Sequence, residues 1–184
     1  MLTTLAAPAF ADIWHIEDGD ITVKAGETGN DVTQKGTTTY GDTDTIITNS
    51  DKNTASSHTV TIEANDKDDK VEVTLKDVNI DTSSRNKAAV SVTGSGNTTI
   101  KLDGDNALKS DSSRSGIYGS GSLTITGGEN DSLTAQGGSG ANGIYSSGSL
   151  TISGGTVTAN GGDGDNGIYS SGSVTISEIG RAHV

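Results

Sequence analysis

The feature that most constrains this chain is a repeat that occurs three times in its second half. Successive blocks begin at Gly116, Gly143 and Gly167 with the tripeptide GIY, and continue as GSGSLTITGG, SSGSLTISGG and SSGSVTIS. The block starts lie 27 and then 24 residues apart. A fixed period in the twenties is typical of solenoids, in which each repeat forms one unit that stacks on the next.

Hydrophobic alternation within a block assigns the two faces of its strands. In the second block the pairs Leu150/Ile152 and Val157/Ala159 each share one parity within their own short strand, while serine and threonine take the other. Alternation with a period of two directs the first set into a core and the second set to solvent. The Gly154–Gly155 pair separates the two short strands, where a positive φ is cheap for glycine alone. The pattern predicts a right-handed, single-stranded parallel β-helix with coils of about 24 residues.

The less regular first half can be threaded in the same way. Alternating segments at Val71–Ile80, Ala88–Val92 and Asn97–Leu102 match positions of the later blocks, and Thr59–Glu63 and Asp20–Val23 supply further strands. At this period, residues 12–177 predict one domain of roughly six or seven coils. A β-sandwich is the competing all-β fold, but its successive strands seldom show the near-identity of these blocks.

Composition limits both the core and the partners. The chain has 26 glycines, one proline, no cysteine and only 3% aromatic residues, which suits a narrow core of small β-branched side chains. Its formal net charge of −12 argues against binding to nucleic acids or anionic membranes. No apolar stretch is long enough to span a bilayer, so we expect no membrane insertion. We expect a monomer.

Both ends of the chain carry segments that we exclude from the domain. Residues 1–11, MLTTLAAPAFA, end in an A-x-A pattern before Asp12 and are interpreted as the remnant of a secretory signal peptide. Export without cysteines fits a secreted or cell-surface bacterial protein. Residues 178–184, EIGRAHV, break the repeat and resemble the translation of a sequencing adapter. We therefore expect the β-helix, residues 12–177, to be truncated at its C-terminus.

Four segments resemble the sequences of a family of secreted bacterial carbohydrate-binding β-helices: VTLKDVNID, AAVSVTGSGNTTIKL, GIYGSGSLTITGG and GIYSSGSLTISGGTVTA. Members of this family bind cellulose-like and acidic, pectin-like polysaccharides. The resemblance implies a fold similar to the pectate-lyase helix, calcium bound at turns, and no lyase activity. It therefore predicts a polysaccharide as the partner, and transfers no individual ligand residue.

Three tyrosines are the candidate ligand-binding residues. Tyr118, Tyr145 and Tyr169 occupy the same position in successive blocks, next to isoleucines that we expect to face the core. The tyrosines should then form an outward ladder that offers ring faces and hydroxyl groups to a sugar. The alternative is that they stack on one another and only stabilise neighbouring coils.

Acidic turns are the candidate metal sites. Calcium prefers six to eight oxygen ligands, and turns with two aspartates around a glycine can supply several of them. The alternative is that these are solvated turns, because Asp-Gly and Asn-Gly are common turn formers. The candidate calcium ligands are Asp103, Asp105, Asp163, Asp165 and Asn166.

Catalytic patterns are missing from the sequence. Between Gly116 and Ser177 there is no lysine, arginine or histidine, and no Ser/His/Asp set or zinc-ligand spacing occurs. We therefore predict a non-catalytic, extracellular polysaccharide-binding domain, with calcium as a candidate cofactor. The alternatives are a structural or adhesive surface repeat protein and, more remotely, a fragment of a pectin-active lyase or hydrolase. Outward threonine rows resemble those of ice-binding solenoids, but serine and asparagine interrupt them.

Overall fold

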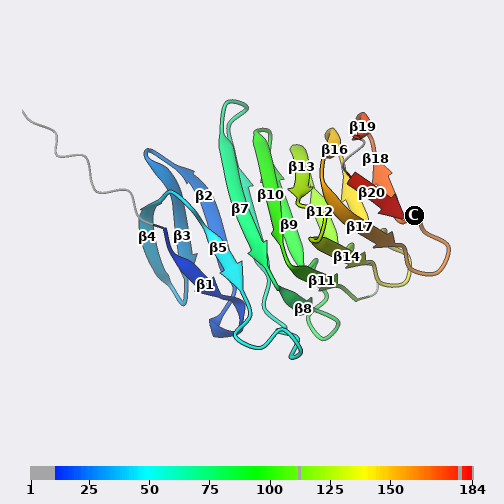
Figure 1. The fold of residues 1–184 in the computed structure, drawn as a ribbon, viewed down its shortest axis with the longest axis horizontal. Helices are drawn as coiled ribbons and strands as arrows, with labels where there is room; N and C mark the ends of the chain where they lie inside the picture. Colours follow the sequence, from blue (N-terminus) through cyan, green and yellow to red (C-terminus); the bar gives the residue numbers. More distant parts are fainter. Residues whose placement is uncertain (1–10, 112, 178–179, 184) are drawn as a thin grey trace, which may run out of the picture.

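The computed structural model, which describes residues 11–111, 113–177 and 180–183, is a β-solenoid of about five turns (Figure 1). Its coils follow one another along one axis, from the N-terminal strands to β18–β20. Each complete coil contributes one strand to each of three sheets, which we name A, B and C, and the strands of successive coils pair in parallel. The described residues contain one short helical element, the 3-10 helix η1 (Ile16–Asp18), and no α-helix.

Each sheet runs along the axis of the solenoid, and its spatially adjacent strands are hydrogen-bonded. In spatial order, sheet A contains β18 (Ile168–Ser170), β15 (Ile144–Ser146), β12 (Ile117–Gly119), β9 (Val90–Gly94), β6 (Val60–Ala64), β2 (Ile21–Gly26), β3 (Gly29–Gln34) and β4 (Thr37–Asp42). Sheet B contains β1 (Ile13–His15), β5 (Ile46–Thr48), β7 (Lys70–Lys76), β10 (Asn97–Asp103), β13 (Ser122–Gly127), β16 (Leu150–Ile152) and β19 (Val174–Ile176). Sheet C contains β20 (Gly180–His183), β17 (Gly155–Asn160), β14 (Ser132–Gln136), β11 (Asp105–Lys109) and β8 (Asn79–Asp81).

The predicted alternation is confirmed, because the aliphatic side chains form columns inside the coils. Ile125 pairs in register with Ile100 on one side and with Ile152 on the other. The four inward residues predicted for the second block are at most 1% exposed: Leu150, Ile152, Val157 and Ala159. Stacking like residues at the inter-strand distance of a parallel sheet fills this narrow core without large side chains.

The spacing of the coils is near 27 residues rather than a uniform 24. Ile117 pairs with Ile144, which is 27 residues later, and Ile144 pairs with Ile168, which is 24 residues later. The shorter value predicted from the second block therefore applies to the last coil. The difference lies in the loops, since the paired strands keep the same register.

An antiparallel hairpin takes the place of part of a coil near the N-terminus. β2 pairs antiparallel with β3, and β3 pairs antiparallel with β4, which forms one end of sheet A. The loop between β3 and β4 consists of Lys35 and Gly36, whose φ angles of 52° and 76° are typical of a two-residue hairpin turn. The prediction of six or seven coils is therefore too high, because this segment folds back on itself and does not stack as a coil.

One core position carries a hydroxyl group with no hydrogen-bond partner. Thr98 is 1% exposed and lies in register between Val71 and Leu123, and its Oγ1 is unpaired. We expect Thr98→Val to raise the free energy of unfolding by about 1 kcal/mol, because valine keeps the shape and removes the desolvation cost. Urea denaturation followed by circular dichroism measures this difference.

Thr82 provides the matched control for this prediction. It is also fully buried, but its hydroxyl donates to the carbonyl oxygen of Lys87 at 2.6 Å. Thr82→Val should therefore lower stability, by about 1–3 kcal/mol, because it leaves that carbonyl without this partner. Equal effects of the two substitutions would contradict this account of the core.

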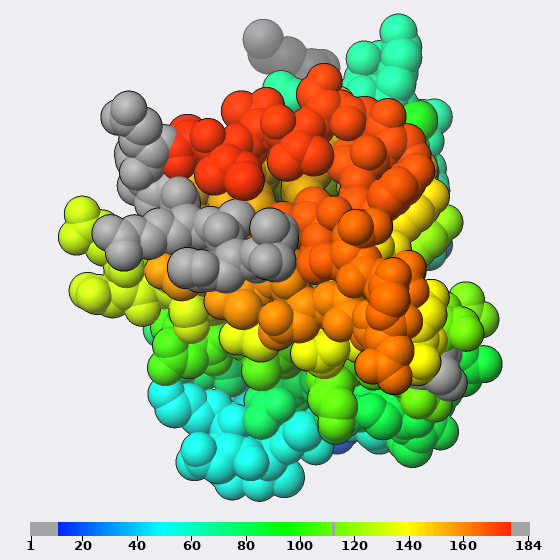
Figure 2. Space-filling view, turned by 90° about the vertical axis from the view of Figure 1, so that its right-hand side faces the viewer, coloured from blue at the N-terminus to red at the C-terminus, as the bar shows by residue number. Residues whose placement is uncertain are grey.

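The last coil exposes part of the core. Val174 and Ile176 in β19 are 47% and 49% exposed, because β19 has a sheet B neighbour on one side only. Figure 2 faces this end, where segments of the last coil in orange and red lie outermost. Within the segment predicted to derive from an adapter, Gly180–His183 form β20, which pairs in parallel with β17. Residues 1–10 of the predicted signal remnant lie outside the described residues.

Candidate functional site

The three predicted ligand-binding tyrosines form one continuous stack on the outer face of sheet A. Tyr118, Tyr145 and Tyr169 pair in register across β12, β15 and β18. The ring centroids of Tyr118 and Tyr145 are 5.1 Å apart with planes inclined by 6°, and those of Tyr145 and Tyr169 are 5.4 Å apart and inclined by 9°. Inward isoleucines at the preceding positions, Ile117 and Ile144, are fully buried and fix the outward direction of the rings.

The stack shows the self-stacking of the alternative interpretation and also keeps part of its rings exposed. Parallel rings at these distances stabilise neighbouring coils, as expected for offset aromatic pairs. Nevertheless Tyr118 remains 45% exposed and Tyr169 43% exposed. The stack therefore supports the fold and also leaves an aromatic surface, with phenolic hydroxyl groups, open to solvent.

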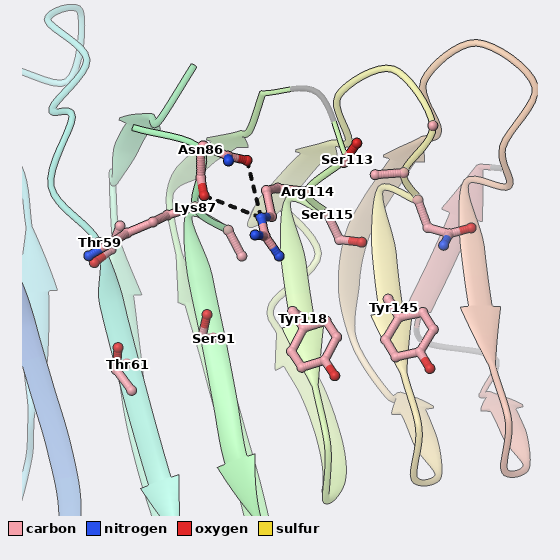
Figure 3. Close-up of a pocket in the computed structure, with 14 residues that line it drawn as sticks. Thr59, Thr61, Asn86, Lys87, Ser91, Ser113, Arg114, Ser115, Tyr118 and Tyr145 are labelled. Atoms are coloured by element: carbon pink, nitrogen blue, oxygen red, sulfur yellow. Dashed lines mark hydrogen bonds between the residues drawn. The ribbon is translucent and has the colours of Figure 1, made fainter. Parts of the chain in front are cut away.

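A groove of about 640 Å³ runs beside this stack, where the loops that lead from sheet C into sheet A rise above the outer face of sheet A. Figure 3 shows its principal side chains, which come from successive strands of sheet A and the loops before them. Its floor includes Thr61, Ser91, Tyr118 and Tyr145, which succeed one another across β6, β9, β12 and β15. The loop side of the groove contains the following residues: Thr59, Asn86, Lys87, Ala88, Ser113, Arg114, Ser115, Gly140, Ala141 and Asn142.

Two cations without acidic partners line the groove. Arg114 and Lys87 are exposed, and neither forms an ion pair within the described part of the chain. The Nε of Arg114 donates to the backbone oxygen and to Oδ1 of Asn86, both at 3.2 Å, as Figure 3 shows. This contact holds the guanidinium group while its two terminal nitrogens keep no hydrogen bond to described residues, so they can receive an anionic or hydroxyl group.

Charge changes sign along the loop side of the groove. Lys87, Arg114, Ala141 and Asp165 occupy equivalent positions in successive coils, three residues before the inward residue that begins each sheet A strand. The positive charge therefore lies over the earlier coils and a negative charge over the last one. An acidic ligand should be held at the Arg114 end and repelled at the Asp165 end.

The predicted calcium ligands fall into two separate turns. Asp103 is engaged by the Nζ of Lys76 at 2.7 Å, and this hydrogen bond raises the pKa of Lys76. Asp105 accepts a hydrogen bond from the hydroxyl group of Ser132 at 2.9 Å. The backbone N–H of Asp105 donates to Asp77, and this bond lowers the pKa of Asp77. This corner between sheets B and C thus satisfies its carboxylates with protein donors.

The second turn, which connects β17 and β18, contains the exposed residues Asp163, Asp165 and Asn166. No group of three or more histidine, aspartate or glutamate side chains within the described ranges is arranged to hold a metal ion. Calcium binding at these turns stays a prediction, which binding measurements in excess chelator test.

A serine, a histidine and a glutamate lie together near the N-terminus but lack the geometry of a catalytic triad. The Nδ1 of His15 contacts the hydroxyl of Ser50 at 3.0 Å and the carboxylate of Glu17 at 3.7 Å. Glu17 also accepts the backbone N–H of Ser50 at 2.8 Å. A triad needs the serine and the acid on opposite ring nitrogens, whereas here both contact the same one.

A bidentate ion pair between Arg85 and Asp20 is structural and joins three coils. Arg85 donates to both oxygens of Asp20, with an Nη2–Oδ2 distance of 2.9 Å, and this pairing holds the pKa of Asp20 far below its usual range. The backbone N–H of Thr59 and the ring of His58 contact the same carboxylate. Because these groups precede β2, β6 and β9, the cluster clamps the first coils together on the side where sheet A begins.

Sequence reasoning found the tyrosines but missed the loop side of the groove. Lys87 and Arg114 belong to no motif, since their neighbours in the sequence differ. The signal was positional: each lies three residues before an inward residue, Val90 or Ile117, that begins a sheet A strand. Aligning the first half to the repeat by core position brings the two cations together.

The comparisons with known proteins give no relative: no protein-family model, no curated protein and no solved structure matches the chain. No helix in the described part of the chain is both long and apolar enough to cross a membrane.

Proposed function

We infer that the chain is a non-catalytic, extracellular polysaccharide-binding β-solenoid, and that the glycan lies in the groove beside the tyrosine stack. The observation that carries this proposal is the combination of exposed stacked rings and unpaired cations in one groove. Aromatic rings contact the apolar faces of sugars, while hydroxyl, amide and guanidinium groups bind sugar oxygens. The stacked coils repeat these groups along the axis, which suits a polymer better than a small molecule.

Charge favours an acidic, pectin-like polymer over a neutral, cellulose-like one. The whole chain carries a formal net charge of −12, so it repels a polyanion at long range. Lys87 and Arg114 reverse this sign locally, and a carboxylate on the sugar can accept charge-assisted hydrogen bonds from the guanidinium group of Arg114. Tyr118, on the same coil as Arg114, and Tyr145, on the next coil, then contact the neighbouring sugar rings.

Titration calorimetry with oligogalacturonides and with cello-oligosaccharides tests this proposal. We expect Arg114→Gln to weaken oligogalacturonide binding by roughly 10- to 100-fold, because it removes a charge-assisted contact. Tyr145→Ala should weaken it roughly tenfold, since an aromatic contact contributes about 1 kcal/mol. Lys67→Gln removes a cation away from the groove, and Tyr40→Ala removes a tyrosine of the N-terminal hairpin that is 71% exposed. Both controls should bind like the unchanged protein.

Excess chelator separates direct binding from calcium bridging. If Arg114 and Lys87 hold the carboxylates, binding persists in chelator and depends on Arg114. If calcium bridges the polymer to acidic turns, binding is lost in chelator, and Asp163→Asn combined with Asp165→Asn abolishes it.

A protein that retains no glycan from a polysaccharide panel would contradict the proposal and favour a structural or adhesive surface repeat. Release of unsaturated uronides would instead identify a pectin-active enzyme.

A further inference from the structure

The carboxylate of Asp42, the last residue of β4, is buried without a cationic partner among the described residues. The residue is 0% exposed. Its Oδ1 accepts hydrogen bonds from the backbone N–H groups of Asp12 and Asp44, both at 3.2 Å, and its Oδ2 accepts one from Nε1 of Trp14 at 2.9 Å. No lysine, arginine or histidine of the described residues forms an ion pair with it. An unpaired charge removed from water is costly, so this position calls for a nearby positive charge.

The side chains around Asp42 do not supply that charge. A hollow of about 240 Å³ beside it is lined by Asp44, Glu72 and Lys70, among others. Lys70 makes no ion pair there, and Glu72 is paired with Lys101 at 2.7 Å. The charges of Asp44 and Lys70 offset each other, and Glu72 is paired with Lys101, so these side chains supply no net positive charge to the buried carboxylate.

Cleavage of a single peptide bond would place a positive charge beside Asp42. The nitrogen that donates to Oδ1 belongs to Asp12, and the A-x-A pattern predicts cleavage of the bond between Ala11 and Asp12. Ala11 is exposed, so this bond lies at the surface of the described chain. We propose that leader removal converts the backbone N–H of Asp12 into an α-ammonium group that forms an ion pair with the buried Asp42 carboxylate.

The chemistry of this step is simple hydrolysis by an external leader peptidase. Water adds across the bond between the Ala11 carbonyl carbon and the Asp12 nitrogen, and Ala11 leaves with a new carboxylate. The released amine of Asp12 takes up a proton at neutral pH, since its ordinary pKa is about 8. The atom is already in place, so the ion pair forms without rearrangement of the backbone.

The new ion pair would stabilise the N-terminal cap of the solenoid, which consists of β1 and the β3–β4 hairpin, after export. Asp42 closes the hairpin on sheet A, whereas Trp14 lies on β1 at the edge of sheet B. Charged contact at Asp12 therefore ties the first strand of one sheet to the last strand of the hairpin on another. This inference rests on the export that the proposed function assumes, and is independent of glycan binding.

The test compares three forms of the same protein: the full chain, the chain cut after Ala11 with a free amine, and the cut chain with an Nα-acetyl group. We expect the free-amine form to melt about 5 °C or more above the other two, the scale expected for a buried ion pair in a chain of this size. Trp14, the single tryptophan, donates to Asp42 and reports the opening of this cap by fluorescence.

Substitutions then assign the effect to Asp42. In an Asp42→Asn background the three forms should melt together, whereas in the background of Asp44→Asn, an exposed neighbour, the difference should persist. Should Asp42→Asn fail to fold, the acetylated form still decides the matter. Equal melting of the free-amine and acetylated forms, or an exported protein whose mass places its N-terminus elsewhere, overturns the proposal. Glycan affinity, measured on the same three forms, tests the proposed function separately. Absence of glycan binding together with the expected difference in melting temperature would contradict the proposed function and leave the ion pair standing.

Discussion

Replacing Ile125 with alanine is expected to lower the free energy of unfolding by about 2–5 kcal/mol. Ile125 is fully buried and lies in register between Ile100 and Ile152, so truncation opens a cavity between two coils. A solenoid is stabilised by interfaces between neighbouring repeats, and this substitution weakens two of them. Urea denaturation followed by circular dichroism measures the loss.

The neighbouring residue is the matched control. Thr124 lies on the outer face of the same strand, in register between Thr99 and Thr151. Thr124→Ala should change stability by no more than about 0.5 kcal/mol. Comparable costs for the two positions would mean that the inward and outward faces of β13 had been assigned wrongly.

Gly94→Ala is expected to cost about 3 kcal/mol or more, through two separate effects. The residue ends β9 with a φ of 95°, a backbone conformation that alanine adopts at a cost. A methyl group there would also overlap the carbonyl oxygen of Ala64, its partner on the neighbouring coil. The overlap cannot relax without separating β6 from β9.

Gly140→Ala isolates the first of these effects. Gly140 has a φ of 75°, and no atom lies within 4 Å of the position that its Cβ would take. Alanine there should cost only the backbone term, about 1–2 kcal/mol. If both glycine substitutions lower the free energy of unfolding equally, the overlap with Ala64 contributes nothing to the cost of Gly94→Ala.

The repeat region was largely predictable because its hydrophobic alternation, its turn residues and its repeat length all indicate the same fold. The inward positions, the glycine turns and the outward tyrosines all follow from the near-identical sequences of the blocks. The structure places Leu150, Ile152 and the three tyrosines as predicted. Because identical residues pack well on one another, the near-identical sequences of successive blocks also determine the register in which their strands pair. The same reasoning worked for the segment at Asn97–Leu102, which pairs with β13 although its sequence differs.

Other features depend on contacts that no local pattern reveals. The hairpin at β3 and β4 alternates like a coil strand, and only the Lys35–Gly36 turn distinguishes it. Arg114 becomes a groove residue because the Asn86 loop lies one coil away and holds its guanidinium group. The burial of Asp42 likewise depends on β1, which is distant in the sequence.

Tyrosine-selective isotope labelling tests the central claim, that a glycan lies along the stack, most directly. The chain has four tyrosines, so the ring signals can be assigned by single Tyr→Phe substitutions. Addition of oligogalacturonide should shift the signals of Tyr118 and Tyr145 in a saturable manner, shift that of Tyr169 less, and leave that of Tyr40 unchanged. Saturable binding of the polymer with no change at Tyr118 and Tyr145 would contradict the account, because the ligand would then lie on another face.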